Sequence, residues 1–255
     1  MSSSSSLYSS SSFIPTPSSP HPFLQHIQKP HVPPTFTFGA DIARFGDDHC
    51  VMWLRHNDWI FNVARWASLD TYESAALISD IIRGYESCGW ICLWGCVDVI
   101  GLGAGVCDNL FHAGDRFKQI IKPINGSMKS SDQSRYYNAR AEVLWNLRSR
   151  FRKHSIRFLM RPTVLKLKET KPELQTYGIH EFLLEKKIIP QGTSLSYKAD
   201  ERRGGAILIE SKEEYKLRVN GESPDELDAL ALAYNDNFIG LEKRKSQGDY
   251  SLGRG

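Results

Sequence analysis

The order of strand-like and helix-like segments constrains the fold of this chain more than any other feature. Three runs typical of β-strands, at residues 35–43, 50–55 and 59–66, precede the first helical pattern, at residues 70–87. Strand-like and helix-like segments alternate after that point. This order predicts an α/β fold, with a mixed central sheet and helices on both faces.

The later segments are read from the same periodicities. Asp70 opens the first helix, and Gly89 closes it. A buried strand, a glycine-rich turn and a short helix are expected next, followed by further strands and helices. The expected strands are 90–98, 118–124, 156–160 and 206–210, and the expected helices are 105–112, 134–153, 163–185 and 224–238.

Composition divides the chain into three parts. Residues 1–34 are rich in Ser and Pro and carry almost no charge, so we expect a disordered tail that cannot bury enough apolar surface to fold. Residues 35–240 are expected to form one α/β domain, and residues 241–255 a flexible C-terminal tail. The apolar content of 41% and the net charge of +3 are typical of a soluble globular protein.

The sequence indicates neither a membrane protein nor a secreted one. Its longest apolar run, at residues 90–97, is too short to span a bilayer. The N-terminal residues lack the pattern of a secretion signal. The five cysteines include no C-x-x-C pair, so no disulfide framework or zinc site is indicated, and a reducing compartment is expected.

A carboxylate ends the first strand-like run. On a strand, Thr37, Gly39 and Asp41 share one face, and the small side chains leave space beside the carboxylate. A buried carboxylate needs a cation, a metal ion or water nearby, because burial without a partner is costly. An aspartate that only caps the strand or forms a turn is the ordinary alternative.

The same arrangement recurs at the end of the buried strand. Asp98 follows the apolar run, and Gly101, Gly103 and Gly105 come directly after it. Glycines let the backbone turn tightly and approach a ligand. Their spacing does not match the dinucleotide fingerprint G-x-G-x-x-G. The alternative is that these glycines only allow close packing at a helix start. This alternative gives no reason for the position of Asp98.

A third acidic group opens the last helix. Pro224 lies at or near the first turn, and Asp225 and Asp228 lie three residues apart on one helical face. Acids at this position also stabilise the helix dipole without any further role. Together with Asp41 and Asp98, they match the needs of a two-metal phosphodiester site, in which carboxylate oxygens hold two divalent cations.

Four stretches, spread over about residues 37–238, resemble the motifs of a known family. They are GADIARFGDDHCVMWLR, CVDVIGLGAGVCDNL, RYYNARAEVLWNLR and LIESKEEYKLRVNGESPDELDALALAYND. In content and order they are similar to the nuclease domain of the large terminase subunit of tailed bacteriophages, which has a ribonuclease H-like fold. The resemblance implies a metal-dependent endonuclease that cuts concatemeric double-stranded viral DNA during genome packaging.

The resemblance also implies roles for individual residues. Asp41, Asp98 and Asp225 would be the catalytic metal ligands, with Asp228 a nearby fourth carboxylate, and two Mg²⁺ or Mn²⁺ ions would be the cofactors. The implied partners are double-stranded DNA, a packaging ATPase, the small terminase subunit and the portal. The implied location is the cytoplasm of an infected host cell.

The chain departs from the family in one respect. The family's large subunit carries an N-terminal packaging ATPase, whereas this sequence contains no G-x-x-x-x-G-K-[ST] loop. On its own, it is not expected to translocate DNA. A separately encoded nuclease, a fragment of a split gene and a remnant are all compatible with this sequence.

Basic residues gather between Arg135 and Lys168, where ten Lys or Arg stand against one acid, Glu142. Such a patch binds phosphates without sequence preference and in a salt-sensitive way, although a solvated helix face is the alternative for any single residue. The expected DNA contacts are Arg140, Arg148, Arg152, Lys153 and Lys212.

Two of these residues have an ambiguous setting. An apolar stripe predicts that most of the helix at 134–153 is packing. Arg140 falls inside this stripe, so it must extend to solvent or pair with an acid near the metal site. Lys212 would meet a scissile phosphate, unless it is an ordinary surface lysine. The stripe consists of Tyr137, Ala141, Leu144, Leu147 and Phe151.

Two other functions are compatible with the sequence. A non-catalytic DNA-binding or packaging-assembly module would keep the fold and the basic patch, but the intact acids count against it. Another ribonuclease H-like nuclease, of the resolvase or integrase type, is the second alternative. The SPDELDALALAY helix and the glycine-rich turn favour the terminase interpretation.

Overall fold

The computed structural model describes residues 32–43, 49–159 and 182–237. Within them, six strands form a mixed sheet in the order β5-β4-β1-β2-β3-β6. β1 to β3 form an antiparallel meander, and β4 and β5 continue the sheet in parallel from β1. The predicted α/β class is confirmed. The strands are β1 (Thr35–Asp41), β2 (Cys50–His56), β3 (Trp59–Trp66), β4 (Ile91–Asp98), β5 (Ile121–Ile124) and β6 (Arg157–Phe158).

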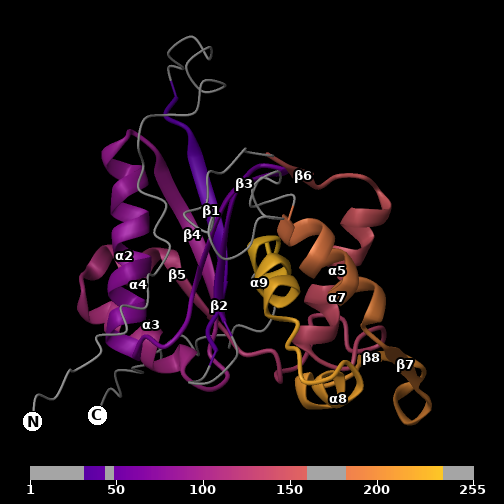
Figure 1. Cartoon of the computed structure of the whole chain (residues 1–255). Helices are drawn as coiled ribbons and strands as arrows, with labels where there is room; N and C mark the ends of the chain where they lie inside the picture. The colour runs from indigo at the N-terminus through magenta and orange to yellow at the C-terminus, as the bar shows by residue number, and fades with distance from the viewer. Residues whose placement is uncertain (1–31, 44–48, 160–181, 238–255) are drawn as a thin grey trace, which may run out of the picture.

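Helices cover both faces of the sheet, as predicted (Figure 1). On one face lie α2 (Thr71–Ser87), α3 (Gly103–His112) and α4 (Asp115–Ile120). On the other lie α5 (Ala139–Arg152) and α9 (Asp225–Ala233). On the side of α5 and α9, the chain also forms the π-helical turn η2 (Leu184–Ile188), α7 (Ile189–Ser194), the hairpin of β7 (Tyr197–Asp200) and β8 (Ala206–Ile209), and α8 (Lys212–Arg218).

Each face of the sheet has its own apolar core. Successive side chains on a strand point to opposite faces. On β1, Phe36 and Phe38 therefore pack into the core beneath α2 and α3. On β2, Met52 belongs to that core, whereas Trp53 belongs to the core beneath α5 and α9. β2 is thus buried on both faces, which explains its almost continuous apolar sequence.

Gly39 lets α9 lie directly against β1. A Cβ atom at this position would be 2.0 Å from the backbone nitrogen of Ala233 and 2.4 Å from the carbonyl oxygen of Ala229. No larger residue fits at this position unless α9 moves. The close contact brings the first turn of α9 to the end of β1, where Asp41 lies.

Some predicted bounds are confirmed and others are wrong. The helix from Asp70 is confirmed, because Asp70 and Glu73 form a reciprocal capping box. Residues 115–120 form α4 rather than the start of a strand, since Gly114 has a φ of 147° and Phe117 and Ile120 are both buried. β5 is therefore shorter than expected.

α5 begins later than predicted. The side chain of Asn138 accepts a hydrogen bond from the backbone nitrogen of Ala141 and so caps the helix. Tyr137, expected on the apolar stripe, precedes the helix, and its backbone N–H donates to the carbonyl of Ile207. The last helix, α9, ends at Ala233 rather than 238.

Besides α4, the structure contains α7, β7 and α8 at positions where no element was expected. The predicted N-terminal tail up to residue 31, the C-terminal tail and most of the helix predicted at 163–185 lie outside the described residues. None of the helices in the described ranges is long and apolar enough to cross a membrane.

Candidate active site

Three carboxylates converge on the ammonium group of Lys212, the first residue of α8. Its Nζ lies 2.7 Å from Oδ2 of Asp41, 3.4 Å from Oδ2 of Asp228 and 3.7 Å from Oδ1 of Asp225. These three aspartates are 2%, 7% and 5% exposed, respectively. Residues that are far apart in the sequence thus form one buried charged cluster at the junction of β1, α8 and α9.

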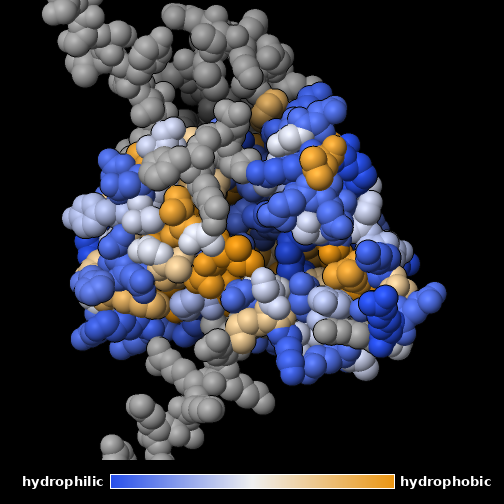
Figure 2. Space-filling model, turned by 90° about the horizontal axis from the view of Figure 1, so that it is seen from below, coloured by the Kyte–Doolittle hydropathy of each residue, from blue (hydrophilic) through white to orange (hydrophobic). Residues whose placement is uncertain are grey.

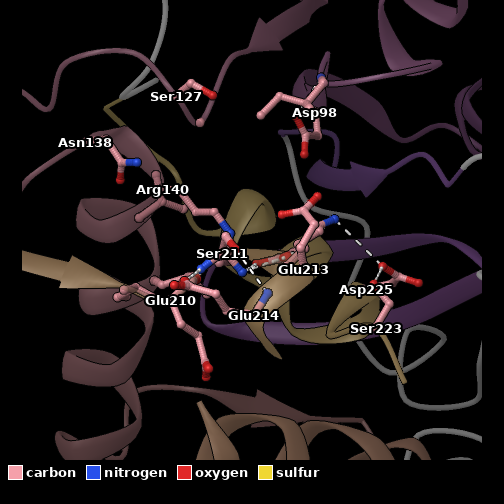
Figure 3. Close-up of a pocket in the computed structure, with 18 of the residues that line it drawn as sticks. Asp98, Ser127, Asn138, Arg140, Glu210, Ser211, Glu213, Glu214, Ser223 and Asp225 are labelled. Atoms are coloured by element: carbon pink, nitrogen blue, oxygen red, sulfur yellow. Dashed lines mark hydrogen bonds and ion pairs between the residues drawn. The ribbon is translucent and has the colours of Figure 1, made fainter. Parts of the chain in front are cut away.

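Asp98, at the end of β4, lines a groove together with Asp225, Asp228 and Lys212 (Figure 3). Its Oδ1 accepts a hydrogen bond of 2.9 Å from the backbone nitrogen of Ile100, which fixes the side chain at the turn. Burial, together with the charge of Asp41, raises the pKa of Asp98 to about 7, although Lys212 opposes this shift. The structure therefore brings Asp98, Asp225 and Asp228 to one groove, and Asp41 joins them through its ion pair with Lys212.

The glycine-rich turn after Asp98 is tightly closed. A Cβ atom at Gly103 would lie 1.7 Å from the carbonyl oxygen of Asp98, and Gly101 has a φ of 83°, which favours glycine. The predicted tight turn is confirmed. The group that Gly103 approaches closely is the backbone of Asp98.

The charge of Lys212 is maintained by its neighbours. Burial alone lowers the pKa of this ammonium, but the charges of Asp41, Asp228, Asp225 and Asp98 outweigh that effect and raise the pKa above its ordinary value. Lys212 is therefore protonated, and it offsets part of the repulsion among the four carboxylates.

Arg140 is a second cation in this cluster. Its Nη2 lies 3.2 Å from both carboxylate oxygens of Asp228, and its Nη1 donates a hydrogen bond of 2.7 Å to the carbonyl of Glu210. Of the two settings expected for Arg140, pairing with an acid of the site is the one observed. Figure 3 shows its side chain reaching into the groove from α5.

Ser223 is a residue that sequence reasoning missed. Its hydroxyl donates a hydrogen bond of 2.5 Å to Oδ1 of Asp225, which orients that carboxylate (Figure 3). A signal was present, because a serine just before a helix start often bonds to the first turn. The sequence Ser-Pro-Asp-Glu has this pattern.

The groove is large and has mixed chemistry. It encloses about 990 Å³, and it is lined on the α8 and hairpin side by the basic residues Lys198, Lys216 and Arg218. Figure 2 looks onto this side of the molecule and shows a hollow with hydrophilic residues inside it and apolar residues on both sides. Three of the four acids, Asp98, Asp225 and Asp228, thus line a groove that has the volume of a substrate-binding site.

The carboxylates are not arranged as a ready-made metal site. Within the described residues, no three His, Cys, Asp or Glu side chains lie close enough together to hold one metal ion. The negative charges of the carboxylates repel one another, and the ammonium of Lys212 lies among three of these carboxylates. The donors nevertheless fit a hard divalent cation, because they are carboxylate oxygens that already surround one positive charge.

The other predicted DNA contacts lie away from the acids. Arg148, Arg152 and Lys153 are exposed at the C-terminal end of α5 and just after it. Arg148 also stacks its guanidinium over the ring of Trp145, 4.5 Å from the centroid. An α-helix rises about 1.5 Å per residue, so Arg152 lies roughly 18 Å along the axis from Arg140. Three further basic residues of the patch lie outside the described ranges, namely Arg161, Lys166 and Lys168.

Comparison with known proteins finds similarity in structure alone. No protein-family model matches the sequence, and no characterised protein matches it. The nuclease domain of the large terminase subunit gp2 of bacterial virus Sf6 is similar, with a TM-score of 0.58 and 20% identity, over 79% of this chain and 87% of that chain. A mutant of that domain was solved with manganese, and it matches with a TM-score of 0.56 and 19% identity, over 79% of this chain and 88% of that one.

A second virus provides a similar structure. The large terminase nuclease of the thermophilic phage G20c matches with a TM-score of 0.50 and 14% identity, over 80% of this chain and 82% of that chain. Identities this low establish a shared fold and no more. The chain has the fold of terminase nuclease domains, which confirms the predicted ribonuclease H-like class.

Proposed function

We propose that this chain is a metal-dependent DNA endonuclease of the terminase type, which cuts double-stranded DNA by hydrolysis of the phosphodiester. The observation that carries this proposal is the convergence of Asp41, Asp225 and Asp228 on one cation, with Asp98 facing the same groove. A fold needs no such cluster for its stability, because buried like charges repel.

Asp41, Asp98, Asp225 and Asp228 would hold two Mg²⁺ or Mn²⁺ ions. Oxygen-only donors suit these ions, and the similar domain of virus Sf6 was solved with manganese. Ions held there would activate water and stabilise the leaving oxygen of the phosphodiester. The role of the chain is to fix the carboxylates: Ser223 orients Asp225, and Arg140 orients Asp228.

Lys212 has two states in this proposal. Without metal, its ammonium pairs with Asp41 and neutralises part of the cluster. Divalent cations carry twice its charge and would displace it from the carboxylates. The ammonium, on a flexible four-carbon stem, would then be free to contact the scissile phosphate, as the sequence predicts.

The duplex would be held by its phosphates. Arg148, Arg152 and Lys153 are exposed, and they extend from the groove along α5 over a distance shorter than one turn of duplex DNA. Contacts of this kind carry no sequence information, so the enzyme would cut with little sequence preference. The packaging ATPase, the small terminase subunit and the portal would be its partners in an infected host cell.

The experiment is cleavage of supercoiled plasmid by the purified chain with Mn²⁺ or Mg²⁺. Nicked and linear products are expected with either ion, and none is expected in EDTA or with Asp98→Asn. Equal cleavage by Asp98→Asn would show that the activity belongs to another site or to a contaminant. If neither protein cleaves but both bind the plasmid, the chain is a non-catalytic DNA-binding module.

A further inference from the structure

Helix α9 carries two of the four acids, but it begins without a cap of its own. Pro224 precedes it, and no side chain at that position bonds to the first turn. The first backbone N–H groups of a helix need partners from elsewhere. One comes from Gln191, in α7, whose Oε1 accepts a hydrogen bond of 2.9 Å from the backbone nitrogen of Leu227.

The same amide group makes two further bonds. Nε2 of Gln191 donates to Oε2 of Glu226 at 2.6 Å and to the carbonyl of Ser223 at 3.2 Å. Gln191 is only 2% exposed, so these bonds are shielded from water. Its partners lie on both sides of Asp225 in the chain, and Gln191 therefore holds the backbone before and after that ligand.

Glu226 links this contact to the sheet. Its Oε1 lies 2.8 Å from Nη2 of Arg65 on β3, and its backbone carbonyl accepts a hydrogen bond of 2.9 Å from Nε1 of Trp53 on β2. Successive residues of an α-helix are about 100° apart around the axis. Fixing Glu226 therefore fixes the rotation of α9, and with it the directions of Asp225 and Asp228.

We propose that Gln191 is a positioning residue that sets the first turn of α9, so that Asp225 and Asp228 face Asp41. The inference rests on the proposed function, because it concerns ligands of the same metal site. Gln191 acts through Ser223, Glu226 and Leu227, and it does not itself line the groove in which Asp225 and Asp228 lie. Gln191 is the third residue of α7, the helix that directly follows the π-helical turn η2, and π-helical turns are frequent near functional sites.

The first measurement is the affinity for Mn²⁺, by titration calorimetry well below the unfolding temperature. Gln191→Leu removes all three hydrogen bonds and fills the buried position with an apolar side chain of similar size. We expect its dissociation constant for Mn²⁺ to rise by about 10–100-fold, as is typical when residues that orient metal ligands are removed. Gln191→Glu keeps the side chain's size and the acceptor but loses both donors, and it is expected to weaken binding as well.

The matched control is Asn62→Leu. Asn62 is also a buried amide, and it bonds to Tyr85 and to the backbone of Val63, next to the core under α2. This variant should lose a comparable amount of stability, but its dissociation constant for Mn²⁺ should stay unchanged. A general loss of stability is thereby separated from a loss of positioning.

The second measurement needs no metal. Amide hydrogen exchange in EDTA, read on peptides that cover residues 223–230, should be faster in Gln191→Leu than in the wild type. The same peptides of Asn62→Leu should exchange at the wild-type rate. This readout reports directly on whether Gln191 holds the start of α9.

The results separate this inference from the proposed function. If the wild type binds Mn²⁺ and both Gln191 variants bind it equally well, Gln191 has no positioning role. Equal weakening by Asn62→Leu would also overturn the inference, since the effect would then be one of stability alone. If the wild type itself binds no Mn²⁺, the proposed function fails, and this inference fails with it. Should Gln191→Leu not fold, Gln191→Glu decides by the same criteria.

Discussion

At the scale of single residues, Lys212 is the centre of the acidic cluster. Its ammonium lies within 4 Å of an oxygen of three buried carboxylates, at 2.7, 3.4 and 3.7 Å. It thereby occupies the position toward which a divalent cation would be drawn. A bound cation and this ammonium compete for the same oxygens.

We therefore expect Lys212→Ala to bind Mn²⁺ more tightly than the wild type, by about tenfold if the competing contact contributes about 1.4 kcal/mol. Titration calorimetry measures the change. The metal-free variant should also unfold at a lower temperature, because three carboxylates lose their cationic partner. Lys118→Ala, on the opposite face of the sheet in α4, is the control and should leave Mn²⁺ affinity unchanged. Weaker binding by Lys212→Ala would contradict competition.

Asp98 has a second consequence at this scale, for the effect of pH on stability. Its pKa is about 7 in the folded protein and 3.8 in its ordinary state, because burial and Asp41 disfavour the charged form. The unfolded chain therefore releases this proton at lower pH than the folded protein. The contribution of Asp98 to stability is fully present below about 3.8 and is lost as the pH rises to about 7.

In EDTA, Asp98→Asn should therefore be more stable than the wild type, and by more at pH 8 than at pH 5. Thermal unfolding measures this difference. A gain of 1 kcal/mol raises the unfolding temperature of a domain of this size by about 2–4 °C. Asp115→Asn, at an exposed position on α4, is the control, and it should not raise the unfolding temperature. An equal gain from Asp98→Asn at both pH values would show that Asp98 is already ionised at pH 5 in the folded protein.

The sequence predicted the acids of the site because each follows a recognisable local pattern. Asp41 and Asp98 come at the ends of apolar strands, and Asp225 lies at a helix start. Gln191 has no such signal. Its partner Glu226 is 35 residues away, and only the packing of α7 against α9 brings the two together.

At the scale of secondary structure, the contact between β1 and α9 determines the distance between the acids. Gly39 is the residue that allows it, because a Cβ atom there would overlap the backbone of α9. The two elements contribute Asp41 on one side and Asp225 and Asp228 on the other. The site therefore depends on a residue that has no side chain.

Gly39→Ala is expected to destabilise the fold by about 1–3 kcal/mol or more, because the added methyl group meets backbone that cannot shift without moving a helix. Chemical denaturation measures this loss. The affinity for Mn²⁺ should fall at the same time, since α9 would lie farther from Asp41. Gly192→Ala is the matched control: its added Cβ would lie 3.8 Å from Leu227, an ordinary contact. If Gly39→Ala were as stable as the wild type, the close packing of α9 on β1 would not be required.

Sequence periodicity predicted the main elements well and the short ones poorly. The alternation along β1 correctly placed Gly39 and Asp41 on one face, where Gly39 meets α9 and Asp41 pairs with Lys212. α8 was missed because it is a single short helix whose position depends on the capping box of Ser211 and Glu214 and on Lys212 reaching the acids. Contacts of this kind are tertiary and leave little periodicity in the sequence.

At the scale of the whole molecule, the acids lie apart from the exposed arginines of α5. Asp98, Asp225 and Asp228 line the groove, whereas Arg148 and Arg152 are exposed farther along α5. Binding of DNA and chemistry at the phosphodiester are therefore expected to be separable. Affinity should come from the basic residues, and cleavage from the acids.

The double variant Arg148→Ala, Arg152→Ala should bind duplex DNA more weakly and to the same extent on unrelated sequences. A plot of the logarithm of affinity against the logarithm of salt concentration has a negative slope. The magnitude of this slope should decrease by about 1 for each phosphate that the variant no longer neutralises. Fluorescence anisotropy in EDTA measures both quantities without cleavage. Lys118→Ala is again the control. A weakening confined to one sequence would indicate that these arginines read bases.

The order of the acids along the chain has a consequence for newly made protein. Asp41 and Asp98 leave the ribosome early, whereas Asp225 and Asp228 lie on α9, the last helix of the described residues. During synthesis, domains generally fold as units, each once its residues are available. A nascent chain that lacks α9 has only half of the carboxylates and cannot complete the site. A nuclease of the proposed kind would thus be harmless to the DNA around it until translation has passed α9.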